Sequence, residues 1–155
     1  SLLRAFARLA RIEVFGRLER CEDVLYSGHS AALKGALTPR QNLMTHPSGL
    51  NAPSDLAIDT ALEAVGVLGH ADVQTARLSA GQKRRVALAR LFLPSPRLWL
   101  LDEPFTALDV QGVNVLEARF LEHARSGGAV VFTSHQSAAL GDELKVLNLE
   151  HYCGD

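Results

Sequence analysis

Two adjacent carboxylates, Asp102 and Glu103, directly follow the apolar run Leu98–Leu101. A short continuous apolar run predicts a strand that is buried on both faces, as in parallel sheets. Ligands of open α/β sheets bind at the carboxyl ends of the strands, where both acids are expected. Asp102 is a suitable oxygen ligand for a magnesium ion, and Glu103 could polarise an attacking water. A single Asp-Glu pair is more often a surface cap, so this interpretation depends on the neighbouring motifs.

A helix start upstream has the residue types of a phosphate site. Ser79 and Gln82 match the capping box, with Ser79 as N-cap and Gln82 at the third helical position. Gly81 in the first turn would let a ligand or another backbone approach closely, and free N–H groups favour a phosphate. The triplet Lys-Arg-Arg at 83–85 crowds the positive end of the helix dipole, where cations are disfavoured without an anion. The alternatives are a capped core helix and a solvated basic face.

The third group is His135, which follows a second apolar run at 129–134. This run also predicts a buried strand, and residues 113–124 between the two strands have helical spacing that ends at Gly127-Gly128. A β-α-β connection makes the strands parallel, so His135 and the two acids should share one sheet edge. If the strands are neighbours, their ends lie about 5 Å apart. A lone histidine is more often structural, but this position favours function.

These motifs together resemble those of the nucleotide-binding subunits of ABC transporters. Leu78–Gln82 is similar to the signature loop, and Leu98–Glu103 is similar to the Walker B strand with its catalytic glutamate. Ala107–Asp109 matches the D-loop, and His135 matches the switch histidine. The resemblance runs from the first residue to about residue 149. It is finer to the ATPases of haem exporters in c-type cytochrome maturation, through the stretches 26–29, 84–91, 102–109 and 133–136.

The resemblance implies an α/β, P-loop NTPase-like fold with a mainly parallel sheet and a helical lobe that carries the signature. It implies one partial nucleotide-binding domain over 1–155, with the helical lobe at about 40–95 and the Walker B, D-loop and H-loop core at about 96–150. ATP and Mg²⁺ are the implied cofactors, with Asp102 on the metal and Glu103 and His135 catalytic.

The implied assembly is a homodimer in which the signature of one copy meets the ATP held by the other. Four residues would then contact ATP in trans: Ser79, Gly81, Gln82 and Asp109. Transmembrane subunits of a haem exporter complex are the other implied partners. They would place the chain peripherally at the cytoplasmic face of the bacterial inner membrane.

Two departures from the family pattern stand out. The phosphate-binding loop, Gly-x-x-x-x-Gly-Lys-Ser/Thr, should directly precede Ser1, and the printed sequence does not contain it. With no initiator Met either, we expect a fragment that does not bind ATP tightly alone and that lacks the N-terminal strands of the fold. Ser30 stands where the family has the Q-loop glutamine. Because a serine reaches less far, we expect weaker coupling to the membrane partner.

Composition limits the function classes. The 155 residues are 47% hydrophobic and 21% charged, which is typical of one soluble α/β domain. The formal charge of -1 gives no support to nucleic-acid binding. Cys21 and Cys153 are far apart with no metal-binding spacing, which fits a reducing cytosol. No apolar run is long enough to span a bilayer, so we expect no direct membrane insertion.

Alternative functions stay open. A DNA-repair or chromosome-structure ATPase has the same motifs but inserts coiled-coil arms, and residues 1–77 show no sustained heptads. The ATPase of another ABC transporter and a non-catalytic remnant also remain. The other expected elements are helices at 1–10 and at 55–68, the latter with Leu56, Leu62 and Val65 on its apolar face and closed by Gly69, strands at 23–26 and 144–150, and a loop at 45–54.

Overall fold

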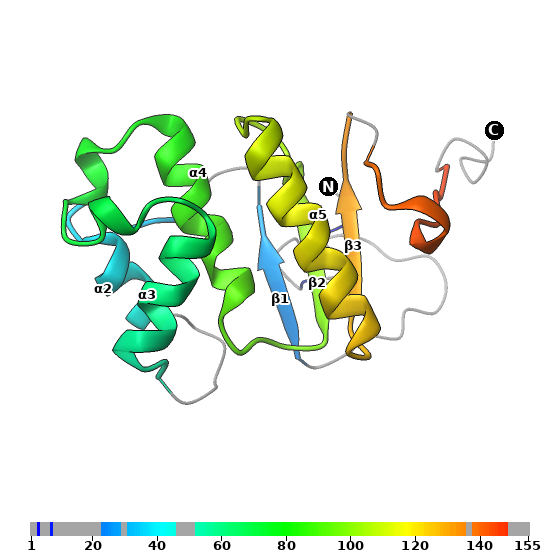
Figure 1. Cartoon of the computed structure of the whole chain (residues 1–155), viewed down its shortest axis with the longest axis horizontal. Helices are drawn as coiled ribbons and strands as arrows, with labels where there is room; N and C mark the ends of the chain where they lie inside the picture. The colour runs from blue at the N-terminus through cyan, green and yellow to red at the C-terminus, as the bar shows by residue number, and fades with distance from the viewer. Residues whose placement is uncertain are drawn as a thin grey trace, which may run out of the picture.

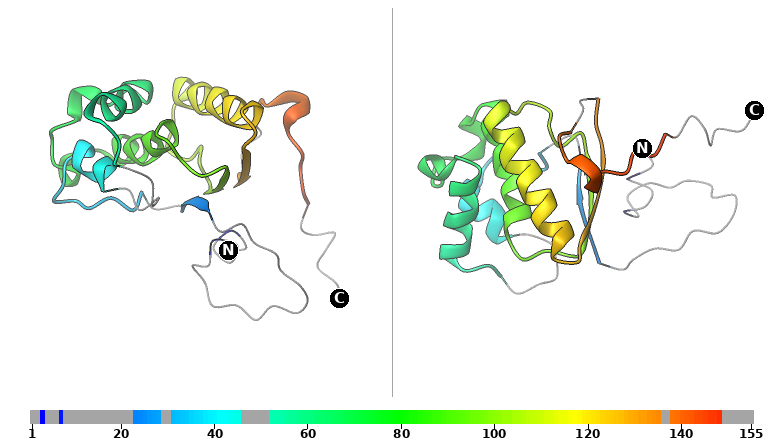
Figure 2. Two further views of the ribbon diagram at one scale, coloured as in Figure 1. Left: turned by 90° about the horizontal axis from the view of Figure 1, so that it is seen from below. Right: turned by 45° about the vertical axis from the view of Figure 1, so that its right-hand side comes forward.

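The computed structural model describes residues 3, 7, 23–28, 31–45, 52–135 and 138–148. Its sheet has three parallel strands in the order β1 (Val24–Ser27), β2 (Leu98–Asp102) and β3 (Ala129–Thr133). Helix α5 (Val110–Arg125) connects β2 to β3 and lies across one face of the sheet, as Figures 1 and 2 show. The predicted parallel β-α-β unit is therefore confirmed.

The central strand β2 is buried on both faces, as its unbroken apolar run predicted. Trp99, Leu100 and Leu101 are all buried, since a strand between two neighbours is covered on each side. The prediction of a buried β3 is wrong in part: its residues are half-buried or exposed, and Val131 is 44% exposed. In the described sheet, β3 is an edge strand that pairs with β2 alone.

Three helices form a lobe to one side of the sheet, beyond β1 (Figure 1). They are α2 (Pro39–Met44), α3 (Asp55–Ala64) and α4 (Ala80–Ala89). Short 3₁₀ turns connect them to the rest of the chain, at Leu68–His70, Thr75–Arg77 and Arg90–Phe92.

Two apolar clusters form the core, and α4 contributes to both. Val86 and Ala89 pack with the lobe cluster around Leu43, Ile58 and Leu62. Leu88, on the other side of α4, belongs to the second cluster under α5. That cluster contains Leu25, Leu91, Trp99, Leu101, Phe105, Leu116, Phe120 and Leu140. Helix α4 therefore packs against both the lobe and the sheet.

The helix predicted for 55–68 is shorter than expected. It ends at Ala64, because Gly66 adopts a left-handed φ of 72°, so Gly66 rather than Gly69 closes the segment. Leu56 is 77% exposed, which corrects its predicted place on the apolar face. Ile58, Ala61 and Leu62 are the buried residues of this helix.

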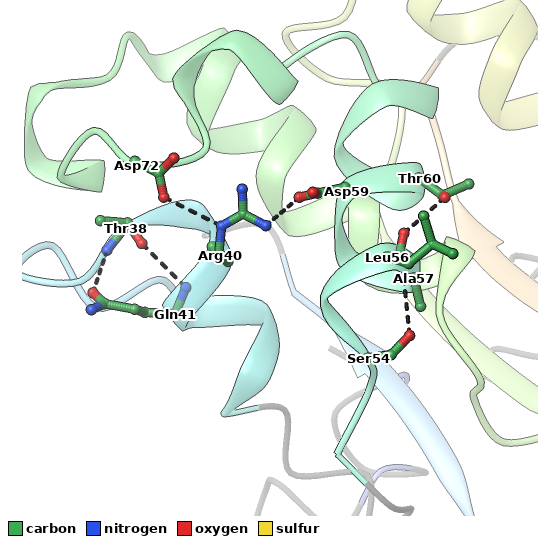
Figure 3. Close-up of polar contacts among 9 residues, drawn as sticks. All are labelled: Thr38, Arg40, Gln41, Ser54, Leu56, Ala57, Asp59, Thr60 and Asp72. Carbon is green, nitrogen blue, oxygen red and sulfur yellow. Dashed lines mark hydrogen bonds and ion pairs between the residues drawn. The ribbon is translucent and has the colours of Figure 1, made fainter.

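A polar cluster joins α2 to its neighbours at the lobe surface. Arg40 on α2 bonds with the carboxylate of Asp59 on α3, and its Nε donates to Asp72 Oδ1 at 3.3 Å (Figure 3). The hydrogen bonds with Asp72 and Asp59 raise the pKa of Arg40. Helix starts in the same view are capped by Thr38 and Ser54. The cluster orders the lobe and stands apart from the strand ends.

The strand predicted at 144–150 is wrong for residues 144–148, which have no strand structure and expose Val146 and Leu147. These residues do not pair with any strand of the described sheet. Most of the helix at 1–10 and of the loop at 45–54 lies outside the described residues, as do Cys21, Ser30 and Cys153. Among the described helices, none has the length and apolar character needed to cross a membrane.

Candidate functional site

The ends of β2 and β3 bring the Asp102 carboxylate and the Glu103 backbone N–H to the hydroxyl of one threonine. Asp102 ends β2, and its register partner on β3 is Thr133. The Thr133 hydroxyl donates to Asp102 Oδ1 at 2.7 Å and accepts from the Glu103 N–H at 3.1 Å. The predicted adjacency of the two strand ends is confirmed, because parallel neighbours in this register carry their last residues to the same edge.

His135 stands at the same edge, two residues beyond the end of β3. Its Nε2 lies 3.3 Å from Glu103 Oε1. The imidazole is 94% exposed, whereas the Glu103 side chain is only 20% exposed. The pair therefore combines a sheltered carboxylate with an imidazole that faces solvent, where a ligand could reach both.

The donor set at this edge fits a magnesium ion that keeps several waters. A carboxylate offers about four lone-pair sites, so the Thr133 bond leaves Asp102 acceptor capacity for a cation or its waters. Within the described ranges, no group of three or more His, Cys, Asp and Glu side chains could enclose a metal. Mg²⁺ is usually held by one or two carboxylates together with phosphate oxygens, and this arrangement matches that pattern.

The predicted capping box at the start of α4 is present. Ser79 Oγ accepts from the Gln82 N–H at 3.2 Å, and Gln82 Oε1 accepts from the Ser79 N–H at 2.9 Å. Gln82 Nε2 also lies 3.1 Å from His70 Nε2. A Cβ at Gly81 would lie 3.5 Å from the Ala107 carbonyl oxygen, so the helix start approaches the loop after β2. Ser79, Gly81 and Gln82 thus form one surface beside that loop.

Asp109 is the N-cap of α5 and is bound within its own chain. Its Oδ1 accepts from the Gly112 N–H at 2.8 Å and from the Arg85 guanidinium at 2.6 Å. Arg85 also donates to the Val65 carbonyl at 2.9 Å. One arginine therefore connects the loop before α5 to the end of the lobe helix α3.

The cations of the basic triplet at 83–85 all have partners within the chain. Arg84 is 5% exposed and donates to the carbonyls of Gly28, Asp102 and Glu103. Lys83 Nζ donates to the Ala76 carbonyl. Arg84 is therefore not part of a solvated face, whereas the contacts of Lys83 and Arg85 lie at the surface, where Arg85 pairs with Asp109. Burial lowers the pKa of Arg84, and the charges of Asp102 and Glu103 oppose that shift.

Sequence reasoning missed Arg84 and Thr133 as parts of this site. Helical spacing could have placed Arg84, because it precedes Leu88 by four residues and Leu91 by seven, and both leucines are buried. Thr133 gave no comparable signal, since its contact with Asp102 depends on the register between β2 and β3.

A cleft of about 220 Å³ lies apart from these groups, between the end of α3 and α5. Val65, Arg85, Leu88 and Gln111 are among its lining residues, and Asp102, Glu103 and His135 are not. The cleft is therefore separate from the strand-end site.

A parallel sheet with charged groups at its carboxyl edge, beside a capped helix start, is the architecture of a nucleotide-binding α/β domain. Residues 18–106 match the family model described as ABC transporter, and the chain belongs to that family. The fold is similar to that of the ATP-binding cassette MJ0796, whose structure is a dimer in a post-hydrolysis state bound to ADP and Pi. The TM-score is 0.59 at 23% identity, over 74% of this chain and 53% of that one.

More similar in sequence are three proteins named "Cytochrome c biogenesis ATP-binding export protein CcmA". The one from Idiomarina loihiensis is 48% identical over 134 residues, which are 86% of this chain and 61% of that protein. The one from Pseudomonas syringae pv. syringae is 53% identical over 118 residues, 73% of this chain and 54% of that protein. The one from Aliivibrio fischeri is 47% identical over 134 residues, with 86% and 66% covered. The chain thus spans about half to two thirds of the length of these relatives.

Proposed function

We propose that this chain is the ATP-binding subunit of an ABC-type exporter that moves haem for c-type cytochrome biogenesis and that it acts by hydrolysing ATP. The names of its relatives support the export pathway, and its family supports the use of ATP. The observation that carries the chemistry is Glu103, which follows the acid Asp102 and lies 3.3 Å from the imidazole of His135.

In this proposal each group at the strand ends has one role. Asp102 would hold Mg²⁺ through water, and the metal, when bound, would neutralise charge on the phosphate oxygens. Glu103 accepts a proton from the attacking water or orients that water. Its side chain is only partly exposed, which restricts the motion of the carboxylate. His135 donates to the γ-phosphate, because its exposed ring can reach outward from the sheet edge. Catalysis is then positioning and charge stabilisation.

The proposed active unit is a homodimer. Ser79, Gly81 and Gln82 would contact the ATP held by the second copy, since backbone N–H groups at the start of α4 favour an anion. Asp109 would lie at the same junction. The transmembrane subunits of the exporter are the other proposed partners, and they would hold the chain peripherally at the cytoplasmic face of the inner membrane.

Three finer points belong to the same proposal. We assign residues of about 40–95 to a helical lobe that transmits motion and residues of about 96–150 to the hydrolytic core. Ser30, in place of a glutamine, would weaken the coupling between them and the membrane partner. The 155 residues printed here would bind ATP weakly by themselves, since they contain no Gly-x-x-x-x-Gly-Lys-Ser/Thr run.

The test is Glu103→Gln in the full-length product of the gene, reconstituted with its transmembrane partners in vesicles. We expect the rate of ATP hydrolysis to fall at least about 100-fold, because the general base is lost. ATP binding should remain, and haem accumulation in the vesicles should stop. The matched control is Glu122→Gln on the exposed side of α5, which should keep the wild-type rate. Near-normal hydrolysis by Glu103→Gln would contradict the assigned role, and hydrolysis without haem movement would contradict the proposed cargo.

A further inference from the structure

The backbone of Glu103 is in a conformation that a glutamate rarely adopts. Its φ is 51°, in the left-handed region that favours glycine. Such a conformation costs energy in a residue with a side chain, and it persists only where the surrounding contacts hold it. The contacts that hold this peptide therefore decide where the Glu103 carboxylate points.

Two side chains hold the backbone of Glu103 from opposite ends. The Thr133 hydroxyl accepts from its N–H at 3.1 Å, and the Arg84 guanidinium donates to its carbonyl at 2.5 Å. Thr133 comes from the end of β3, and Arg84 comes from the second turn of α4. Because the two bonds fix the peptide units on either side of its Cα, Glu103 has little freedom to rotate out of the left-handed region.

The same two side chains also hold Asp102. Thr133 donates to Asp102 Oδ1 at 2.7 Å, and Arg84 donates to the Asp102 carbonyl at 3.2 Å. Arg84 reaches the Gly28 carbonyl at 3.1 Å as well, one residue past the end of β1. One guanidinium thus links the ends of β1 and β2 to the helix that begins at Ser79.

The shape of the Arg84 guanidinium suits its contacts with three carbonyls. A planar guanidinium presents five donors in a fork, so it can serve three carbonyls that a lysine ammonium would have to share from one point. The negative charges of Asp102 and Glu103 partly offset the cost of burying the Arg84 guanidinium. The arginine is therefore suited to positioning these acids from the protein side.

We propose that Arg84 and Thr133 are positioning residues for Asp102 and Glu103. They keep the Glu103 peptide in its left-handed conformation and orient the Asp102 carboxylate, and through α4 they tie both acids to the signature-like helix start at Ser79. The expected effect on kinetics rests on the proposed function, whereas the contacts of Arg84 and Thr133 with the two acids are a property of the fold.

The test compares Thr133→Val, which keeps the side-chain shape but has no hydroxyl, with Thr133→Ser, which keeps the hydroxyl. In the full-length gene product, we expect Thr133→Val to lower kcat about tenfold or more with little change in the KM for ATP, as for other lost supporting contacts. Thr133→Ser should recover most of the rate. Amide hydrogen exchange at Glu103, measured without nucleotide, should become about tenfold faster in Thr133→Val, because its N–H loses its acceptor.

Arg84→Lys and Arg84→Met test the second contact. We expect kcat to fall in both, more in Arg84→Met, with the KM for ATP changed less than kcat. Two controls separate positioning from folding. Thr60→Val removes a hydroxyl that donates to a carbonyl on α3, and Arg119→Met removes a guanidinium that donates to the Leu91 carbonyl. Both should keep the wild-type kcat, even where the thermal midpoint falls.

The outcomes separate the two proposals. Unchanged exchange at Glu103 in Thr133→Val would overturn the proposed positioning role of Thr133. An equal loss of kcat in Thr133→Ser and Thr133→Val would overturn it as well. If the wild-type protein does not hydrolyse ATP, the proposed function fails, and the exchange measurement still decides whether Thr133 holds the Glu103 peptide.

Discussion

His123 is a buried imidazole whose contacts are all structural. Its ring stacks on Trp99 at 3.6 Å between centroids, and its Nε2 donates to the Arg97 carbonyl at 2.9 Å. The stack connects the last turns of α5 to the start of β2. Gly128 passes directly over this ring as the chain turns into β3. The contrast with the exposed His135 shows that residue type alone does not separate a packed histidine from a candidate catalytic one.

Gly128→Ala should destabilise the protein through this contact. The added Cβ would lie 2.2 Å from His123 Nε2, so the stacked ring would have to move. We expect the free energy of unfolding to fall by about 1–3 kcal/mol, as for other overpacked sites. Chemical denaturation measures the change. Gly69→Ala is the control, since no atom lies within 4 Å of its Cβ position, and its stability should stay within about 1 kcal/mol of wild type. Equal stability of the two variants would contradict the packing argument.

At the scale of elements, helix α4 contacts the lobe, the sheet cluster and the end of β2. Its capped start presents Ser79 and Gln82 at the surface, while its two sides pack into the lobe and the sheet cluster. Arg84 adds a polar link from the same helix to the ends of two strands. A displacement of this helix would therefore move the proposed signature surface and the backbone of Asp102 and Glu103 together.

Ser79→Ala and Ser54→Ala separate capping from the proposed contact with ATP. Both serines cap a helix through their hydroxyls, Ser79 on α4 and Ser54 on α3. Each substitution should cost about 1 kcal/mol of stability, because an N–H at the helix start loses its acceptor. Only Ser79→Ala should also slow ATP hydrolysis. Thermal unfolding and steady-state rates give the two measurements. A similar rate loss in both variants would mean that Ser79 acts through stability alone.

At the scale of the whole molecule, the proposed signature residues and the proposed catalytic acids lie on different elements. Ser79 begins α4 at the lobe, whereas Glu103 and His135 belong to the edge of the sheet. Ser79 and Gln82 bond with each other and Gln82 lies beside His70, whereas the Glu103 N–H bonds with Thr133. This separation suits a dimer in which each copy completes the site of the other.

Mixing two inactive variants tests the dimer. A copy with Gly81→Asp has intact acids and a disrupted signature, and a copy with Glu103→Gln has the reverse. Each should be inactive alone, since every site then lacks one half. The mixture should recover part of the wild-type rate, because a mixed two-fold dimer contains one intact site. Steady-state hydrolysis of the full-length proteins at varied ratios measures the recovery. A mixture as inactive as its components would contradict the arrangement in trans.

Local patterns were sufficient to predict much of the fold and part of the site. The buried β2, the capped start of α4 and the spacing of α5 were all predicted, because each depends on residues close together in the chain. The predictions that failed depended on neighbours. Val131 is exposed at a sheet edge, Leu56 lies outside the lobe core, and residues 144–148 do not pair with the described sheet.

The sequence by itself determined the chemistry that this chain can offer: Asp102 and Glu103 at the end of an apolar strand, His135 after the next, and a capping box at Ser79. Such features are local, because hydrophobic spacing and capping act over a few residues. Only the tertiary structure decided which groups hold those acids. Arg84 lies 18 residues from Asp102 and Thr133 lies 30 from Glu103. Their contacts arise from strand register and helix packing, which bring together residues that are distant in the chain.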